Sequence, residues 1–160
     1  MTLPELPVTD VLAPLAAALM EKGAAVLVAP PGAGKTTLVP LYLLNAVQNK
    51  IILLEPRRVA ARAAARRMAS LLGEDVGQTV GYAMRLDTRQ SAATRILVVT
   101  EGVFTRMILT DPELAGVDCV IFDEFHERSL DADFGLALTL DVRAALRPDQ
   151  IGRASCRERV

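Results

Sequence analysis

The sequence offers few aromatic side chains from which to build a core. Its 160 residues contain no tryptophan, and aromatic residues make up 4% of a chain that is 51% hydrophobic. The core must therefore consist of Leu, Val, Ile and Ala, a composition that suits a buried parallel sheet covered by helices. The length allows one domain with a real core and is too short for two domains of ordinary size.

Cysteine and long apolar runs are also scarce. Cys119 and Cys156 show no CxxC or metal-ligand spacing, so we interpret both as reduced thiols and place Cys119 in the core. The apolar runs end well short of the roughly 20 residues that span a bilayer, and the N-terminus lacks the basic start and cleavage site of a signal peptide. These absences predict a cytoplasmic protein with no membrane partner.

A large excess of one charge is missing as well. The net charge of -1 argues against a chain that coats nucleic acid through bulk charge. The charges are nevertheless uneven: residues 57–95 hold eight arginines and three acids, whereas residues 101–133 hold nine acids and two arginines. Such an order is expected of a domain that binds a polyanion on one surface and a cation-dependent ligand on another, although solvated helix faces explain part of it.

Five short apolar runs, each followed by a segment with helical spacing, predict the fold. Their lengths, bounded by Gly, Pro and charge, are typical of buried strands, and the spacers leave room for crossover helices. The expected strands cover 24–29, 51–54, 79–83, 96–100 and 119–122. Helices are expected over 11–22, after a capping pair at Thr9 and Asp10, and over 36–48, 58–72, 103–109 and 132–146. The predicted class is α/β, with a doubly wound, mostly parallel sheet that binds ligands outside the carboxyl ends of its strands.

The first expected strand runs into Ala29-Pro-Pro-Gly-Ala-Gly-Lys-Thr36, which fits the phosphate-binding pattern GxxxxGK[ST] except for Ala29 at the first position. Glycines allow the tight backbone that points N–H groups at a phosphate, and the following helix adds its positive end. The alternative is a glycine-rich turn with a chance lysine, and the strand-loop-helix context weighs against it. The predicted nucleotide-binding residues are Pro31, Gly32, Ala33, Gly34, Lys35, Thr36 and Thr37.

Within this loop the residues have different expected roles. Lys35 should reach the β- and γ-phosphates of ATP, and the Thr36 hydroxyl should ligate Mg²⁺. Thr37 is expected to support the start of the helix.

The apolar run 119–122 ends in Asp123-Glu124-Phe125-His126. Asp123 is expected near Thr36, where its carboxylate would hold Mg²⁺, and Glu124 is placed to orient or deprotonate the attacking water. Pairs of acids are common on surfaces. The position at the end of an apolar strand, roughly ninety residues after the lysine, makes this pair specific.

Asp123-Glu-Phe-His-Glu-Arg-Ser129 resembles the DEAH-box signature of superfamily-two helicases, with Phe125 where Ala is usual. Glu55-Pro-Arg-Arg-Val-Ala-Ala61, Gly81-Tyr-Ala-Met-Arg85 and Thr100-Glu-Gly102 resemble bacterial members of that family, in the right order, and the resemblance covers about residues 6–147. It implies that residues 1–148 form the first, RecA-like motor domain of an ATP-dependent 3′-to-5′ RNA helicase. A second RecA-like domain, implied as a partner, lies outside this chain.

The resemblance also implies a surface for single-stranded RNA. Arg57 and Arg58 resemble motif Ia, and Thr100, Glu101 and Gly102 resemble motif Ib, which in the family touch the sugar-phosphate backbone. Arginine forks, a hydroxyl and an exposed glycine N–H are ligands that suit phosphate and carry no sequence information. Two alternatives stay open: Arg57 pairs with Glu55 or Asp123, and Thr100 simply ends a strand.

Two further residues take roles from the family alone. Arg67 is the best match to an arginine that packs on the adenine base. His126 is grouped with the catalytic residues Lys35, Asp123 and Glu124, and it is expected to link the nucleotide site to the second domain rather than to act as an acid or base.

The last residues depart from the family pattern. Where a strand and a Ser-Ala-Thr motif should follow, residues 149–160 show no strand pattern, and we expect a foreign or disordered tail, which we leave out of the fold prediction. Two other functions remain open, namely another phosphate-loop NTPase such as a DNA translocase, and a non-catalytic nucleotide-binding scaffold. The intact Lys35, Thr36, Asp123 and Glu124 weigh against the scaffold.

Overall fold

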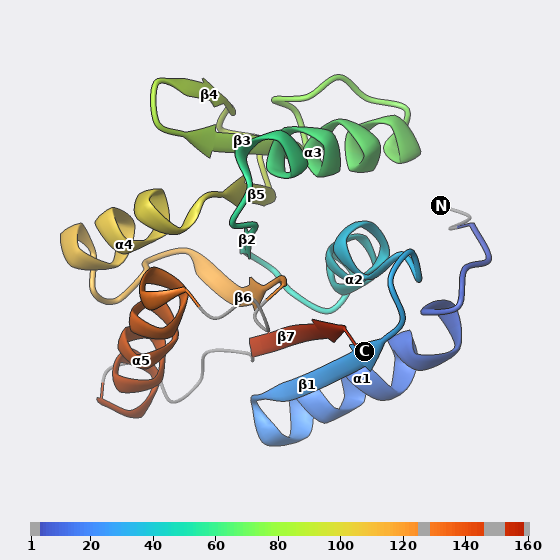
Figure 1. The fold of residues 1–160 in the computed structure, drawn as a ribbon, viewed down its shortest axis with the longest axis horizontal. Coiled ribbons are helices and arrows are strands. Elements are labelled where there is room, and N and C mark those ends of the chain that lie inside the picture. The colour runs from blue at the N-terminus through green and yellow to red at the C-terminus, as the bar shows by residue number, and fades with distance from the viewer. Residues whose placement is uncertain (1–3, 125–128, 146–152, 159–160) are drawn as a thin grey trace.

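A computed structural model describes residues 4–124 and 129–145, together with the backbone of residues 153–158. These residues form a seven-stranded sheet with helices on both faces (Figure 1). The helices are α1 (Thr9–Lys22), α2 (Lys35–Leu43), α3 (Arg58–Leu72), α4 (Glu101–Thr110) and α5 (Leu130–Ala145). The strands are β1 (Ala25–Ala29), β2 (Lys50–Leu54), β3 (Val80–Met84), β4 (Asp87–Arg89), β5 (Ile96–Val99), β6 (Val117–Phe122) and β7 (Arg153–Glu158).

The strand order is β1-β7-β6-β2-β5-β3-β4. The β3–β4 hairpin is antiparallel, and each of the other adjacent pairs is parallel. Leu54 at the end of β2 pairs with both Val99 of β5 and Phe122 of β6, so the three central strands end level with one another. The predicted α/β class with a mostly parallel sheet is confirmed.

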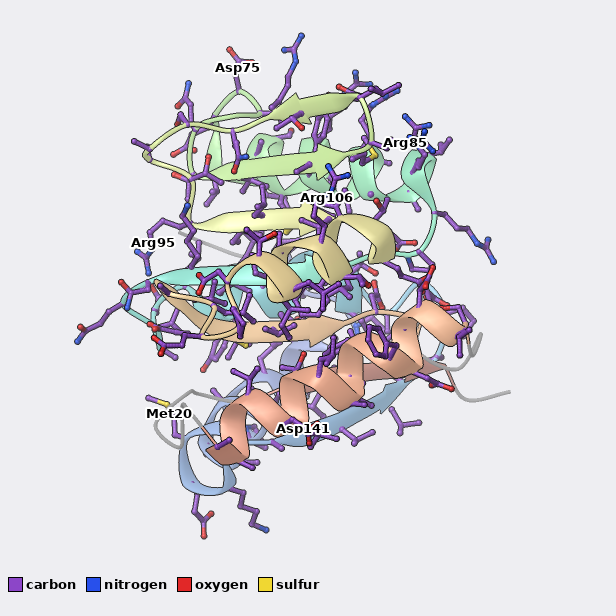
Figure 2. The ribbon with its side chains drawn as sticks, turned by 90° about the vertical axis from the view of Figure 1, so that its left-hand side faces the viewer. Met20, Asp75, Arg85, Arg95, Arg106 and Asp141 are labelled. Carbon is purple, nitrogen blue, oxygen red and sulfur yellow. The ribbon has the colours of Figure 1, made fainter. Side chains whose placement is uncertain are left out.

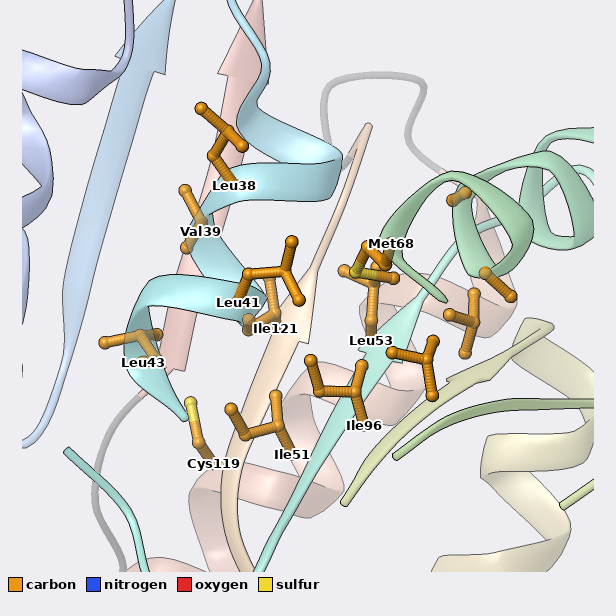
Figure 3. Packing of buried hydrophobic residues seen from close by; sticks show 14 of the residues in the cluster. Leu38, Val39, Leu41, Leu43, Ile51, Leu53, Met68, Ile96, Cys119 and Ile121 are labelled. Atoms are coloured by element: carbon orange, nitrogen blue, oxygen red, sulfur yellow. The ribbon is translucent and has the colours of Figure 1, made fainter. Parts of the chain in front are cut away.

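The helices divide between the two faces of the sheet. Helices α1, α2 and α3 cover one face, and α4 and α5 cover the other (Figure 1). Successive residues of a strand point to opposite faces. Accordingly Ile51 and Leu53 pack in the cluster under α2 and α3 (Figure 3), whereas Ile52 and Leu54 pack in the cluster under α4. Burial on both faces explains why the strands are continuous apolar runs.

Cys119 lies in the core on β6 and is fully buried, as predicted (Figure 3). Burial raises the pKa of its thiol to about 12, and the nearby carboxylate of Asp118 adds to the shift. The thiol is therefore protonated and unreactive at neutral pH. The side chain of Cys156 is outside the described part of the chain.

Two helix ends differ from the sequence-based expectation. Helix α1 begins at Thr9 with Val8 as its N-cap, and Thr9 Oγ1 accepts the N–H of Leu6 at 3.1 Å, so the expected cap at Thr9 and Asp10 was wrong. Helix α2 ends at Leu43 rather than at residue 48. The carboxylate of Asp118 accepts the N–H groups of Gln48 and Asn49, which holds these residues in the turn before β2.

Strand β7 corrects the expectation for the tail. Residues 153–158 lie between β1 and β6 in parallel register, with Ala154 opposite both Ala25 and Ile121. The space between two parallel strands offers backbone donors and acceptors on both sides, which a chain without proline can pair with whatever its side chains. The foreign origin of this segment stays a prediction.

Among the described residues, no helix has the length and apolar composition needed to cross a bilayer.

Candidate nucleotide and nucleic-acid site

The predicted site residues and one further acid, Glu55, follow the parallel strands at the edge of the sheet where the carboxyl ends of the strands lie. The loop after β1, Asp123 after β6, Glu55 after β2 and Thr100 after β5 occupy this edge in the order of the strands. Neighbouring strands lie about 4.8 Å apart. Figure 2 shows this edge on the side of the strand arrowheads, where Arg85 is labelled, and Arg95 lies at the opposite edge. The fold therefore brings together groups that are far apart in the sequence.

The loop Ala29–Thr36, here called the phosphate loop, depends on two glycines with left-handed backbone. Gly32 has φ 73° and Gly34 has φ 91°. A Cβ at Gly34 would lie 2.6 Å from Cδ1 of Leu6, whereas a Cβ at Gly32 would have nothing within 4 Å. The N–H of Val8 donates to the carbonyl of Ala33 at 3.1 Å, so the segment before α1 braces the loop. The backbone therefore favours glycine at both positions, and a side chain at Gly34 would also have to displace the end of the Leu6 side chain.

Lys35 is the first residue of α2 and is only 5% exposed. Its Nζ donates to the carbonyls of Ala29 at 2.9 Å and Pro30 at 3.4 Å. These carbonyls hold the ammonium where oxygens of a bound phosphate could replace them as acceptors. Thr36 is half-buried beside it, and Thr37 Oγ1 donates to the carbonyl of Gly34 at 3.4 Å. The support that Thr37 is expected to give to the helix start stays a prediction. The first turn of α2 contains no acidic residue, so its positive end suits an anion.

The acid pair, Asp123 and Glu124, ends β6 in a tight turn. Asp123 is 4% exposed, and its N–H donates to the carbonyl of Leu54 at 3.0 Å. Its Oδ1 accepts the N–H of Glu124 at 3.0 Å. Glu124 has φ 50°, a left-handed conformation that is uncommon for a residue with a side chain. Strained backbone of this kind is concentrated at functional sites. Here the strained residue is Glu124, which is expected to orient or deprotonate the attacking water.

Glu55 is a third carboxyl group at this position, and sequence reasoning named it only as a partner for Arg57. It is 3% exposed at the end of β2. Burial raises its pKa from 4.5 to about 7; the Arg57 N–H, which donates to Glu55 Oε1 at 3.2 Å, opposes the shift, and the carboxylates of Asp123 and Glu124 reinforce it. The sequence signal that could have identified Glu55 was an acidic residue directly after an apolar strand. The carboxylates that surround Glu55 in the fold, Asp123 and Glu124, come from another part of the chain.

Arg57 and Arg58 lie at the start of α3, and both are exposed. The backbone N–H of Arg57 makes the hydrogen bond to Glu55, and the charge of the Arg57 side chain, which is exposed, also lowers the pKa of Glu55. Arg58 Nη2 donates to the carbonyl of Arg85 at 3.0 Å, which places the turn of the β3–β4 hairpin beside this pair. Arginine side chains therefore gather on the surface next to the acid pair.

Thr100, Glu101 and Gly102 form the junction between β5 and α4. Thr100 directly follows the strand, as the alternative reading held, and it is also the N-cap of α4, with φ -84° and ψ 157°. Gly102 is exposed, and a Cβ at this position would have nothing within 4 Å. The open space around this position leaves room for a ligand to approach the backbone, and the expected contact with nucleic acid stays a prediction. The carboxylate of Glu101 accepts Ser129 Oγ at 2.7 Å.

Two sequence-based assignments gain no support from the geometry. His126 lies outside the described residues. Arg67 is exposed on α3, and its contact with adenine stays a prediction.

The oxygen donors at this edge fit Mg²⁺. A carboxylate from Asp123 and a hydroxyl from Thr36 are hard ligands, and Mg²⁺ commonly binds one or two protein oxygens together with substrate phosphates and water. No cluster of three His, Cys, Asp or Glu side chains that could hold a metal occurs in the part of the chain described. This donor set suits an ion that arrives with a nucleotide rather than one held by protein alone.

The family model for DEAD/DEAH box helicases matches residues 12–152. The chain belongs to the DEAD/DEAH box helicase family. The ATP-dependent RNA helicase HrpB of Escherichia coli strain K12 is 58% identical over 146 residues, which are 90% of this chain and 18% of that protein. The human putative ATP-dependent RNA helicase DHX57 is 42% identical over 118 residues, 69% of this chain and 8% of that protein.

Solved structures agree with the sequence relatives. The crystal structure of the Escherichia coli DEAH/RHA helicase HrpB matches with a TM-score of 0.91 and 55% identity, over 95% of this chain and 20% of that one. The RecA-like fold and the expected resemblance to a bacterial DEAH-box helicase are therefore confirmed. This helicase-family chain spans about a fifth of the length of these bacterial relatives.

Proposed function

We propose that the chain is the first motor domain of an ATP-dependent RNA helicase that binds Mg-ATP and the backbone of single-stranded RNA. One observation carries the proposal: the phosphate loop, the acid pair and the junctions at Arg57 and Thr100 follow parallel strands that end at the same edge of one sheet. The nucleotide and the nucleic acid would then lie only a few strand spacings apart. A conformational change at the nucleotide site can therefore be transmitted to the nucleic-acid site through the few strands and loops between them.

The phosphate loop would hold the nucleotide by its backbone N–H groups, with Lys35 on the β- and γ-phosphates. Thr36 and Asp123 would be the protein ligands of Mg²⁺, which neutralises charge on the phosphates when it is bound. Glu124 would orient the attacking water and accept its proton. Phosphoryl transfer depends mainly on such positioning, and the buried Lys35 and Asp123 supply it.

The nucleic-acid contacts would be made by Arg57, Arg58, Thr100 and the backbone of Gly102. All are suited to phosphate oxygens, so binding should be insensitive to base sequence. RNA as the substrate is supported by relatives named as RNA helicases. A cytoplasmic location and a 3′-to-5′ direction remain what the resemblance to DEAH-box helicases implies. A second RecA-like domain would complete the nucleotide site across a cleft.

The proposal is tested by ATP turnover in a chain extended to carry both motor domains. We expect turnover to require Mg²⁺ and to rise with single-stranded RNA more than with single-stranded DNA of the same length. Greater stimulation by DNA would support a translocase instead, and failure of calorimetry to detect Mg-ATP binding would support a non-catalytic scaffold.

A further inference from the structure

Ser129 joins the first turns of two helices. Its carbonyl accepts the N–H of Asp133 at 3.0 Å, and its Oγ accepts the N–H of Ala132 at 2.9 Å, so Ser129 caps α5. The same Oγ donates its proton to Glu101 Oε1 at 2.7 Å. Glu101 is the first residue of α4. A hydroxyl can accept from one group and donate to another, and here it does both.

Next to this hydrogen bond, α4, α5 and β6 contact one another around two aromatic rings. The rings of Phe104 in α4 and Phe122 in β6 meet edge to face, with centroids 5.9 Å apart and an interplanar angle of 84°. A Cβ at Gly135 of α5 would lie 3.2 Å from Phe104 and 3.8 Å from Phe122. The missing side chain therefore lets α5 pack closely against both rings, and Figure 2 shows α4 and α5 side by side on this face.

The position of this junction gives it a role. Glu101 stands between Thr100 and Gly102, the proposed ligands of the nucleic-acid backbone, and Phe122 directly precedes Asp123. A carboxylate would repel a phosphate backbone. Although the resemblance to motif Ib places Glu101 among the backbone contacts, its carboxylate is a poor ligand for RNA. Its hydrogen bond to Ser129 gives the carboxylate a structural role instead.

We propose that Glu101 and Ser129 are positioning residues that couple single-strand binding at Thr100 and Gly102 to the placement of Asp123 and Glu124 for hydrolysis. The inference rests on the proposed function. Bound single-stranded RNA that shifts the N-terminus of α4 would move Ser129 through the hydrogen bond to Glu101. It would also move the end of β6 through the contact between Phe104 and Phe122. Neither Glu101 nor Ser129 touches the nucleotide in this mechanism.

Variants of Ser129 can remove its hydrogen bond to Glu101, here called the link, while they keep its cap on the N-terminus of α5. Ser129→Asp keeps a good N-cap acceptor, but it has no proton to donate and places a second carboxylate against Glu101. Ser129→Asn keeps an acceptor and supplies an amide donor, so it should preserve both functions. Thr139→Ala is the matched control, because it removes a buried hydrogen bond to Gly135 in the same helix and leaves the link intact.

The readout is the ratio of ATPase rates with and without saturating poly(U) in a chain that carries both motor domains. We expect Ser129→Asp to lower this ratio about tenfold, within the usual range of coupling between sites. Its basal rate and its KM for ATP without RNA should match those of the wild type, whereas its melting temperature should fall, because a hydrogen bond is lost and two carboxylates face each other. Ser129→Asn and Thr139→Ala should keep the wild-type ratio.

Each other result has a definite meaning. A folded Ser129→Asp protein with the wild-type ratio would overturn the coupling role, because the link is broken while the cap remains. If the wild type itself is not stimulated, the proposed function fails rather than this inference. Should Ser129→Asp not fold, adding Glu101→Gln removes the repulsion and restores a donor to the Asp carboxylate. Recovery of folding and of the ratio would support the link, and recovery of folding alone would refute the coupling.

Discussion

The two sets of proposed ligand-binding residues share one edge of the sheet but differ in burial. Lys35 and Asp123 are 5% and 4% exposed, whereas Arg57 and Arg58 are exposed. The buried set is fixed by the fold before any ligand arrives, and such preorganised groups act strongly because little reorganisation is needed. The exposed set faces water and salt, where each contact contributes little by itself. The nucleotide site should therefore lose most of its function through single substitutions, and the nucleic-acid surface should lose it gradually.

The largest effect in this comparison is expected from Glu124→Gln. The amide keeps the size and shape of the side chain but cannot accept a proton from the attacking water, so turnover should fall by about 10² to 10⁴. Affinity for Mg-ATP should stay nearly unchanged. Steady-state ATPase and calorimetry on a chain with both motor domains measure the two quantities, with Glu113→Gln as a control away from the edge. Turnover at the wild-type rate would remove Glu124 from the chemistry.

Lys35→Ala should weaken Mg-nucleotide binding to this chain by about 3 kcal/mol, because a charge-assisted contact with phosphate is lost while the other ligands remain. Lys22→Ala at the exposed end of α1 removes the same charge at a distance from the loop. Isothermal calorimetry that gave equal affinity for wild type and Lys35→Ala would contradict the phosphate-loop assignment.

Glu55→Gln should change how the stability of the metal-free chain depends on pH. The pKa of Glu55 rises from 4.5 to about 7 on folding. The folded state therefore holds the proton more tightly, and the stability that this provides is complete below pH 4.5 and lost as the pH rises through about 7. Gln keeps the acceptor for the Arg57 N–H and has no charge to bury.

The variant should consequently gain stability over the wild type as the pH rises from 4.5 to above 7. The gain should reach about 2 to 3 kcal/mol, since one pKa unit corresponds to about 1.4 kcal/mol. Urea unfolding in EDTA at several pH values measures it. Unfolding free energies of wild type and variant that stay parallel over this range would show that Glu55 does not carry the shift.

The smallest effect concerns the exposed set. Replacing Arg57 and Arg58 together by Ala should lower affinity for single-stranded RNA modestly and should flatten the slope of log affinity against log salt by about one to two, since each lost phosphate contact removes about 0.7 from the slope. Arg66 and Arg89, both exposed, provide a control pair with the same change in charge. An unchanged slope, or a strong preference for one RNA sequence, would argue against backbone recognition.

The difference between the two sets also explains what the sequence could predict. Strand β2 was recognisable because Ile51–Leu54 is buried on both faces and reads as one apolar run. The glycines, lysine and acids of the nucleotide site were recognisable because their spacing is local. Glu55 was missed because its environment comes from Asp123 and Glu124, which are distant in the sequence.

Elements that depend on their neighbours were missed for the same reason. Strand β4 has only three residues, Asp87–Arg89, and is held by pairing with β3 and by contacts of Asp87 with Arg62 and Tyr82. Strand β7 forms because β1 and β6 flank it. Neither strand has a hydrophobic pattern of its own, so the local sequence does not predict either of them.

The place of β7 has a consequence for the dynamics of the nucleotide site. Strand β1 is the outermost strand of the sheet, and among the described strands it is hydrogen-bonded to β7 alone. Opening of β7 would release β1 from the rest of the sheet, and the phosphate loop begins where β1 ends. The amide protons of β1 should then exchange with deuterium in one cooperative unit with those of β7, faster than the protons of the central strands β2, β5 and β6. The rigidity of the loop that holds the phosphates thus depends partly on a segment that lies more than a hundred residues later in the chain.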